Sequence, residues 1–293
     1  MTNNPASRRV VRARLRRLVA AIPPRGGYLF YGAYVAFTFF AFAWVLSTSL
    51  RTNQQLFADV WGIPSGDGVS NFPNVWTNSG LGLAFLNSVI AAVGGSALAV
   101  GLAAPAAYVL SRASFRGRDI ITNVFAAGMG VPAALLIIPM YLMMNQMGLT
   151  SSVTGLLIVY VAISLPFTML ILTAFFATLP VELEEAAVID GASEWRVFRS
   201  VMLPLAQPGV LTALIFNFVF LWKEFFWGLV LLQSRDSRTL AVALNGLRES
   251  LAFSANWVGM FAAVVIVMVP ALVVYIVLSR RVLGAVTLGA VKQ

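Results

Sequence analysis

Six apolar stretches, each about long enough to cross a lipid bilayer, constrain this chain most strongly. They lie at about residues 28–50, 81–110, 120–144, 153–179, 209–232 and 257–278. A helix needs about 20 mainly apolar residues to cross the hydrocarbon core. Because lipid offers no hydrogen-bond partners, spanning segments of this kind fold as α-helices. The sequence therefore predicts an all-α, polytopic membrane protein with six transmembrane helices.

The connecting segments differ sharply in their basic residues. Residues 1–27 contain seven arginines and no acidic residue, and segments 111–119, 181–208 and 280–293 add three, two and three Lys or Arg. The other side of the predicted topology has four: Arg51, Arg235, Arg238 and Arg248. Basic residues concentrate on the cytoplasmic side of membrane proteins. Both termini are therefore predicted to be cytoplasmic, and the net charge of +9 needs no nucleic acid as partner.

A secretory signal is the competing interpretation of the N-terminal end, since a basic region precedes an apolar one. The apolar stretch is too long for the hydrophobic core of a signal peptide, and no small-residue cleavage site follows it. Segments 51–80 and 233–256 are predicted to be external loops. The external aromatic residues Trp61, Trp76 and Trp257 suit anchoring at the membrane interface better than receptor contact.

Composition excludes several kinds of chemistry. Charged residues make up 11% of the chain, far below the roughly 25% of soluble domains. Cysteine and histidine are absent, which removes disulfides, thiol chemistry and the commonest metal ligand. Lys223 and Lys292 lie in LWKEF and AVKQ, and neither fits a phosphate-binding P-loop. We therefore expect no catalytic residue, metal or cofactor on this chain, and any ATP hydrolysis on a different polypeptide.

Small residues and helix breakers predict how the spans pack. Gly95, Ala99, Ala103 and Ala107 recur every four residues, a stripe that permits close helix packing in lipid. Packing explains the stripe better than solute contact. In the third span, residues 128–132 contain two glycines and a proline, and Pro139 follows. These residues predict a kinked helix that faces the interior of the bundle.

The polar stretch 181–208 separates the fourth and fifth spans and holds five of the eleven acidic residues. Pro180 precedes a run of good helix formers, and Gly191 can break the helix. A second short helix is predicted from Ser193 up to Pro204. So polar a segment has no reason to lie in lipid. It is predicted to project into water as a docking element.

The order of residues in this stretch resembles the cytoplasmic coupling loop of permease subunits in bacterial ATP-binding-cassette (ABC) importers. Glu185-Ala186-Ala187 is followed by Gly191, and after nine more residues by Val201-Met202-Leu203-Pro204. Val201 stands where the family usually has isoleucine. Weaker matches point to permeases for carbohydrates, in particular to the second, maltose-type subunit; they are Asn87-Ser88, Ala106-Ala107-Tyr108, Ile138-Pro139-Met140-Tyr141 with Asn145, Gly148-Leu149, and the segment 284–292.

This resemblance implies a multi-pass cell-membrane permease with a basic tail (1–27), a six-span domain (28–279) and a cytoplasmic tail (280–293). It implies two ATPase subunits that use ATP and Mg²⁺, a second homologous permease and an external solute-binding protein, besides membrane lipid. The solute would be a di- or oligosaccharide or a related polyol. Residues implied to couple to the ATPase are Glu184, Glu185, Ala186, Ala187, Asp190, Gly191, Leu203 and Pro204.

The fifth span carries polar and aromatic residues that suggest a solute pathway. They are Asn217, Trp222, Lys223, Glu224 and Phe225. A charged pair within a span is costly unless it faces water or a partner, and aromatic rings beside polar groups suit sugars. Lys223 departs from the family's usual Asn or Asp. An ion pair between permease subunits explains Lys223 and Glu224 equally well.

Other functions stay open at this point. The nearest is an ABC permease for a non-sugar solute. A stand-alone, ion-coupled secondary transporter would transport without ATP, although such carriers usually place several ionisable groups in their spans. A membrane-embedded enzyme or scaffold would show no solute flux with any partner.

Overall fold

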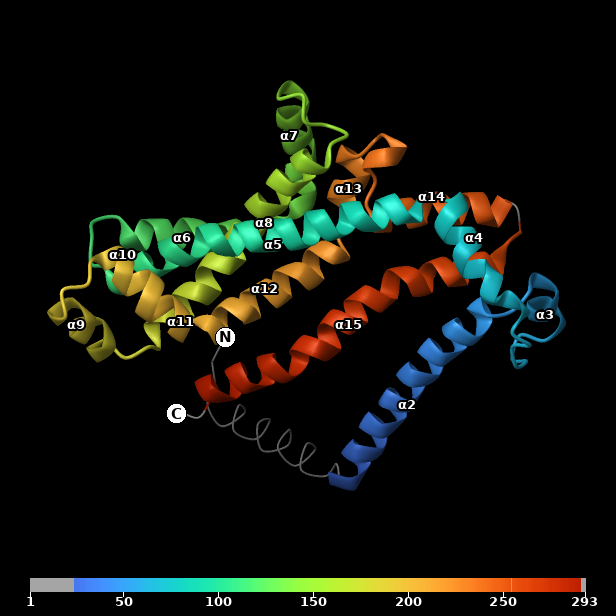
Figure 1. Ribbon diagram of the computed structural model, residues 1–293, viewed down its shortest axis with the longest axis horizontal. Coiled ribbons are helices and arrows are strands. Elements are labelled where there is room, and N and C mark those ends of the chain that lie inside the picture. The colour runs from blue at the N-terminus through green and yellow to red at the C-terminus, as the bar shows by residue number, and fades with distance from the viewer. Residues whose placement is uncertain (1–23, 254, 291–293) are drawn as a thin grey trace, which may run out of the picture.

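The computed structural model describes residues 24–253 and 255–290, and this part of the chain is helical without a strand (Figure 1). The predicted all-α class is thus confirmed. The long helices are α2 (Pro24–Ser49), α5 (Leu81–Arg112), α8 (Val153–Ala177), α12 (Gln207–Trp222) and α15 (Trp257–Ala290). The shorter ones are α3 (Asn53–Ala58), α4 (Asn71–Asn78), α6 (Arg118–Met129), α7 (Ala133–Gln146), α9 (Glu182–Ile189), α10 (Glu194–Val197), α11 (Leu203–Leu205), α13 (Phe226–Leu231) and α14 (Leu240–Phe253).

Four described helices, α2, α5, α8 and α15, are each long and apolar enough to cross a membrane. Two further pairs qualify only together, because each is bent: α6 with α7 by 102°, and the run Glu194–Leu205 with α12 by 73°. The count reaches six when each bent pair is taken as one span. The prediction of several membrane helices is confirmed, and the exact number of six stays a prediction.

The third predicted span is broken rather than merely kinked. Helix α6 ends with Gly130 as its C-terminal cap, and α7 begins after Pro132. The break therefore falls where glycine and proline predict it, but α7 continues through Pro139 as one helix. Twelve residues of α-helix rise only about 18 Å, so α6 alone is too short to cross a hydrocarbon core of about 30 Å.

Two predictions about the C-terminal half are wrong. The fifth span does not run as one helix from residue 209 to 232, since α12 ends at Trp222 and α13 starts at Phe226. The segment 233–256, predicted to be a loop, contains the 14-residue helix α14. Most residues of α14 are good helix formers or apolar, and the helix packs on α5 and α15. The last helix continues to Ala290, and its candidate membrane span, Trp257–Ile276, agrees with the span predicted at about residues 257–278.

Segment 51–80 folds around a buried arginine. Only 2% of Arg51 is exposed, and its Nη1 donates to the carbonyl oxygens of Asp59 (3.0 Å) and Val60 (3.1 Å). Asn71 Nδ2 donates to the carbonyl oxygens of Ser49 (2.9 Å) and Arg51 (2.8 Å). These bonds hold α3, the short 3₁₀ turn η1 (Asp67–Ser70) and α4 against the end of α2.

Helix α5 is the centre of the molecule and packs against α8 and α12. The predicted stripe forms this contact: Ala99, Ala103 and Ala107 are completely buried. A Cβ on Gly95 would lie 3.0 Å from Leu221 Cδ1 and 3.2 Å from Tyr160 Cβ, so the three backbones approach closely. The packing interpretation of the stripe is confirmed.

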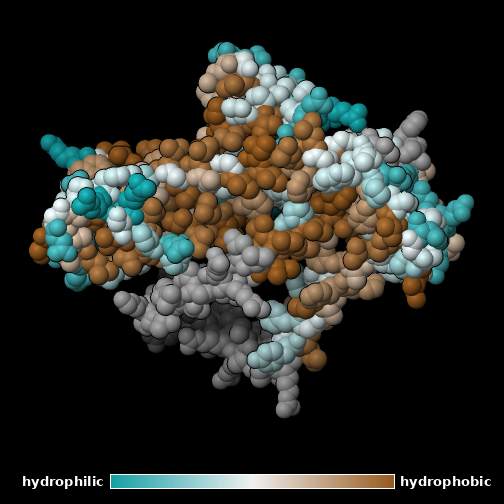
Figure 2. Space-filling view, viewed as in Figure 1, coloured by the Kyte–Doolittle hydropathy of each residue, from teal (hydrophilic) through white to brown (hydrophobic). Residues whose placement is uncertain are grey.

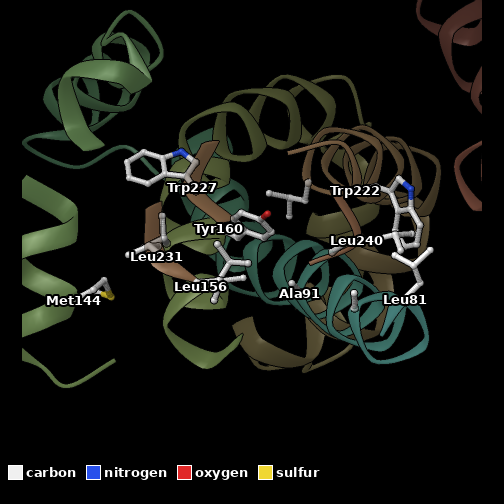
Figure 3. Close-up of a cluster of buried hydrophobic side chains, with 14 of the residues drawn as sticks. Leu81, Ala91, Met144, Leu156, Tyr160, Trp222, Trp227, Leu231 and Leu240 are labelled. Atoms are coloured by element: carbon white, nitrogen blue, oxygen red, sulfur yellow. The ribbon is translucent and has the colours of Figure 1, made fainter. Parts of the chain in front are cut away.

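The buried cluster around α5 also includes Trp222 and Leu240, which lie beside Leu81 in Figure 3. Hydrophobic residues cover the middle of this body, and polar residues gather at its two ends (Figure 2). One end carries α9 and the other carries α14, as Figure 1 shows. Basic segment 1–27 lies almost entirely outside the described residues, as do residues 291–293.

Candidate functional site

The polar stretch 181–208 forms the predicted pair of short helices at one end of α5. Helix α9 ends at Ile189 with Asp190 as its C-terminal cap, and Gly191 adopts a left-handed conformation with φ of +80°. Glycine takes this conformation without steric cost, so it makes the tight turn into α10. The second helical run continues from Glu194 to Leu205, one residue beyond the predicted end.

Pro204 shapes the second helix. Proline has no N–H to donate, and its ring clashes with the carbonyl four residues earlier. The preceding residues Phe198–Met202 accordingly form a π-helical turn (η2), in which the Leu203 N–H donates to the Phe198 carbonyl. Phe198 and Met202 are buried by this turn and join the packing of α5 and α8. Leu203 is half-buried and Pro204 is exposed.

Glu184 attaches α9 to the C-terminal end of α5. Its Oε1 accepts a hydrogen bond from the Tyr108 hydroxyl, and its Oε2 lies 3.4 Å from Arg112 Nε. Arg112 also donates from Nη2 to the Leu179 carbonyl at 2.6 Å. The two charged side chains are only 22% and 13% exposed, and theirs is the only ion pair among the side chains that the structure describes. This cluster joins α5, the end of α8 and α9.

The other predicted coupling residues have a different position. Glu185, Ala186, Asp190 and Gly191 are exposed, whereas Ala187 is half-buried against the cluster around Phe198. The exposed side of α9 also includes Val188 and Ile189, the latter 85% exposed. We call the exposed residues Glu185, Ala186, Val188 and Ile189 the docking face. It combines a carboxylate with small and apolar side chains, which is the composition expected of a surface that meets another protein.

A cavity of about 660 Å³ lies beside the break between α6 and α7. Residues from α6, α7, α8, α12 and α13 line it, among them Ser164, Phe167, Phe216, Asn217 and Phe220. Asn217 Nδ2 donates to Thr168 Oγ1 at 2.8 Å, and Thr168 Oγ1 donates to the Ser164 carbonyl at 2.7 Å. Ser164 Oγ is buried and has no hydrogen-bond partner among the described residues. The cavity thus presents aromatic walls with a few polar groups.

Asn217 is the one predicted pathway residue that lines this cavity. Trp222 instead packs between helices: it is 5% exposed, its Nε1 donates to the Val267 carbonyl at 3.2 Å, and its ring contacts Phe85 and Phe218. Phe225 is half-buried and precedes α13. Sequence reasoning placed the five residues together, but the structure separates Asn217 from the others.

Glu224 holds the start of α13. Its carboxylate accepts hydrogen bonds from the backbone N–H groups of Trp227 (2.9 Å) and Gly228 (3.3 Å), and from the Tyr160 hydroxyl (3.0 Å). An anionic side chain suits this position because the first N–H groups of a helix lack partners within it. Lys223 is exposed and forms no ion pair with Glu224. The charged pair therefore acts as two separate groups within this chain.

Sequence reasoning missed several residues of these sites. Tyr108 and Arg112 appeared only as part of a motif and of a basic turn, and their pairing with Glu184 depends on tertiary structure. Ser164 and Thr168 carried no sequence signal apart from being polar within an apolar span.

Comparison with known proteins agrees with this architecture. A family model described as the binding-protein-dependent transport system inner membrane component matches residues 95–283. The diacetylchitobiose uptake system permease protein NgcG of Streptomyces coelicolor is 39% identical over 246 residues, which cover 84% of this chain and 82% of NgcG. The trehalose transport system permease protein SugB of Mycobacterium tuberculosis is 30% identical over 249 residues, or 85% of this chain and 90% of SugB.

Among solved structures, a chain of a bacterial ABC transporter involved in the import of the acidic polysaccharide alginate has the same fold. The TM-score is 0.75 at 23% identity, and the match covers 91% of this chain and 97% of the other. The family model spans well over half of the sequence. This chain therefore belongs to the family of binding-protein-dependent transport system inner membrane components and is a multi-pass protein of the inner membrane.

Proposed function

We propose that this chain is the permease subunit of an ABC importer for a sugar, a di- or oligosaccharide or a related polyol. Two relatives with at least 30% identity over most of the chain are named for uptake of diacetylchitobiose and trehalose, and these names support the sugar class. The aromatic and polar lining of the cavity supports it independently, because sugar C–H faces stack on rings while hydroxyls need directed hydrogen bonds.

The proposed assembly has four kinds of subunit. This chain pairs with a second, homologous permease, and two ATPase subunits bind from the cytoplasm and use ATP and Mg²⁺. An external solute-binding protein delivers the sugar. The chain crosses the membrane six times with both termini cytoplasmic, its segments being 1–27, the permease domain 28–279 with the coupling loop 181–208, and 280–293. It binds no cofactor of its own.

The attachment of α9 to α5 is the observation that carries the proposal. The docking face is turned to solvent, while Glu184 on the same helix contacts Tyr108 and Arg112 of α5. Helix α5 in turn packs against α8 and α12, which line the cavity. A movement of α9 driven by closure of the ATPase pair therefore reaches the cavity through contacts between packed helices. Such a movement would shift the permease between inward-facing and outward-facing states.

Within the cavity, Asn217 and Ser164 are the proposed hydrogen-bonding groups for the solute. The free hydroxyl of Ser164 is the stronger candidate, because a buried hydroxyl without a partner is costly and gains most from a solute hydroxyl. Glu185, Ala186 and Ala187 with Asp190 and Gly191 form the proposed ATPase-coupling helix and turn. Leu203 and Pro204 lie in the second helical run, Glu194–Leu205, and shape its end.

The test is purification of the wild-type chain with its partners in mild detergent, followed by uptake of labelled diacetylchitobiose and trehalose into proteoliposomes. We expect the wild type to co-purify with an ATPase and to import sugar only with ATP and the solute-binding protein. Gly191→Pro should lose the ATPase, because proline cannot adopt a positive φ. Glu185→Ala should weaken ATPase binding and leave the fold intact, since Glu185 is exposed.

The outcome also separates the alternatives. Uptake by the purified chain alone, driven by an ion gradient, would make it a secondary transporter. ATP-dependent uptake of another solute, without competition from any sugar, would support the ABC importer assignment and contradict the sugar assignment. If the Gly191→Pro protein still co-purifies with the ATPase, the proposed role of this turn in coupling is wrong.

A further inference from the structure

A second polar site lies at the opposite end of α5 from α9. It is a pocket of about 400 Å³ between the start of α5, the 3₁₀ turn η3 (Arg235–Ser237) and α14. Its walls include Gly80, Leu83, Arg235, Arg238, Gly246 and Ser250. It shares no lining residue with the cavity near Asn217. The pocket is therefore separate from the proposed solute site.

Helix α5 fixes the loop that carries the two arginines. Asn87 Nδ2 donates to the carbonyl oxygens of Asp236 (2.8 Å) and Arg238 (3.1 Å). At the next residue of α5, Ser88 Oγ accepts a hydrogen bond from the N–H of Leu240 at 2.7 Å. Asn87 and Ser88 are both at least 94% buried, so these bonds are shielded from water. The backbone that carries the two arginines is thus held in place before any partner arrives.

Among the side chains that the structure describes, the pocket lining carries two positive charges, Arg235 and Arg238, and one negative charge, Asp236. Neither Arg235 nor Arg238 forms an ion pair among the side chains that the structure describes. Arg238 Nε is buried without an acceptor, and its Nη1 lies 3.4 Å from the position that a Cβ of Gly246 would occupy. Asp236 is exposed and adds one carboxylate on the same turn. A buried charged donor without an acceptor is costly, so the pocket is suited to an anionic group that supplies the missing acceptor.

The length of α5 determines which side of the membrane this pocket faces. The helix has 32 residues and rises about 48 Å, longer than the hydrocarbon core. Arg112 at its C-terminal end contacts α9, and Leu83 near its N-terminal end lines the pocket. If α9 meets an ATPase in the cytoplasm, the pocket opens outside the cell.

We propose that an acidic side chain of the external solute-binding protein docks in this pocket and pairs with Arg235 and Arg238. The inference rests on the proposed function, which supplies that partner. A protein carboxylate fits better than a free anionic solute, because the pocket lies apart from the solute cavity. Arginine binds carboxylates through paired N–H groups, and the apolar side chains of Leu83 and Leu247, which also line the pocket, offer no competing acceptor.

The first test measures how much solute-binding protein is needed for half-maximal stimulation of ATP hydrolysis by the reconstituted transporter. Arg235→Gln should raise that concentration about ten-fold or more, since it removes a charge-assisted hydrogen bond. Asp236→Asn should lower it, because it removes a competing negative charge. Opposite effects from adjacent exposed residues would not arise from misfolding. Arg248→Gln, on an exposed arginine of α14 outside the pocket, is the matched control and should leave it unchanged.

The second test traps the contact. Arg238→Lys keeps the charge and provides an amine that a carbodiimide can join to a docked carboxylate, and mass spectrometry then identifies the partner's Asp or Glu. Arg248→Lys should give no such product. Unchanged half-saturation in Arg235→Gln, or a cross-link equally strong from Arg248→Lys, would overturn the docking proposal while the importer stands. No stimulation of the wild-type ATPase by any solute-binding protein would overturn the proposed function itself.

Discussion

Removing the carboxylate of Glu184 should release α9 from α5. Glu184→Ala deletes the acceptor for the Tyr108 hydroxyl and the partner of Arg112, which are both largely shielded from water. A hydrogen bond to a charged group is worth about 1.5–3 kcal/mol, and a partly exposed ion pair adds up to about 1 kcal/mol. Arg112 keeps its bond to the Leu179 carbonyl, so its own position is preserved. The expected loss of attachment is about 1.5–4 kcal/mol.

Hydrogen exchange of the α9 backbone measures this loss directly. An isolated helix of eight residues is unstable in water, so α9 unfolds when its attachment opens. Each 1.4 kcal/mol changes the opening equilibrium about ten-fold, and exchange of the α9 amides should therefore accelerate on the order of ten-fold or more. Glu184→Gln should give a smaller effect, because its side-chain carbonyl still accepts from Tyr108.

The control is Glu185→Ala, which changes the adjacent exposed residue by the same number of atoms. It should leave exchange within a few-fold of wild type. Equal exchange in the Glu184→Ala and Glu185→Ala proteins would refute the attachment of α9 through Glu184.

Three further substitutions test the packing of the chain, two by thermal unfolding in detergent and one by hydrogen exchange. Gly209→Ala should lower the midpoint by several degrees, because the added Cβ would overlap the ring of Phe175 and overpacking costs about 1–3 kcal/mol. Its control, Gly101→Ala, meets no atom within 4 Å and should raise the midpoint slightly by improving helix propensity. Gly191→Ala should cost about 1–2 kcal/mol through its positive φ alone, and an unchanged midpoint would contradict the left-handed conformation at this turn. Glu224→Ala should destabilise the start of α13 by about 1–3 kcal/mol, seen as faster local hydrogen exchange.

Residues whose effects are local could be predicted from the sequence. The turn at Gly191 and the break at Gly130 and Pro132 depend on backbone preferences that each residue brings with it. The stripe at Gly95 and Ala99 was predictable because small residues four apart leave a flat helix face. In each case the local structure follows from the conformational or packing properties of a few residues close together in the sequence.

Residues whose roles depend on tertiary contacts could not be predicted. The helical repeat does not reveal whether Glu184 or Glu185 faces α5, since that depends on where Arg112 ends its own helix. Hydropathy treats Trp222 and Lys223 as parts of one span, although the chain stops being helical between them. Helix α14 was missed because charge patterning marked its segment as external, and an external segment was equated with a loop.

The uninterrupted course of α5 through Pro105 has a geometric consequence. Its small-residue stripe lies near the middle, and its ends lie at Leu81 and Arg112. A stiff rod held at its centre moves its two tips in opposite directions. A tilt of about 10° displaces each tip of a 48 Å rod by ~4 Å, roughly the width of a side chain. A change at the Leu81 tip too small to alter any secondary structure is thus large enough to remake contacts at the Arg112 tip.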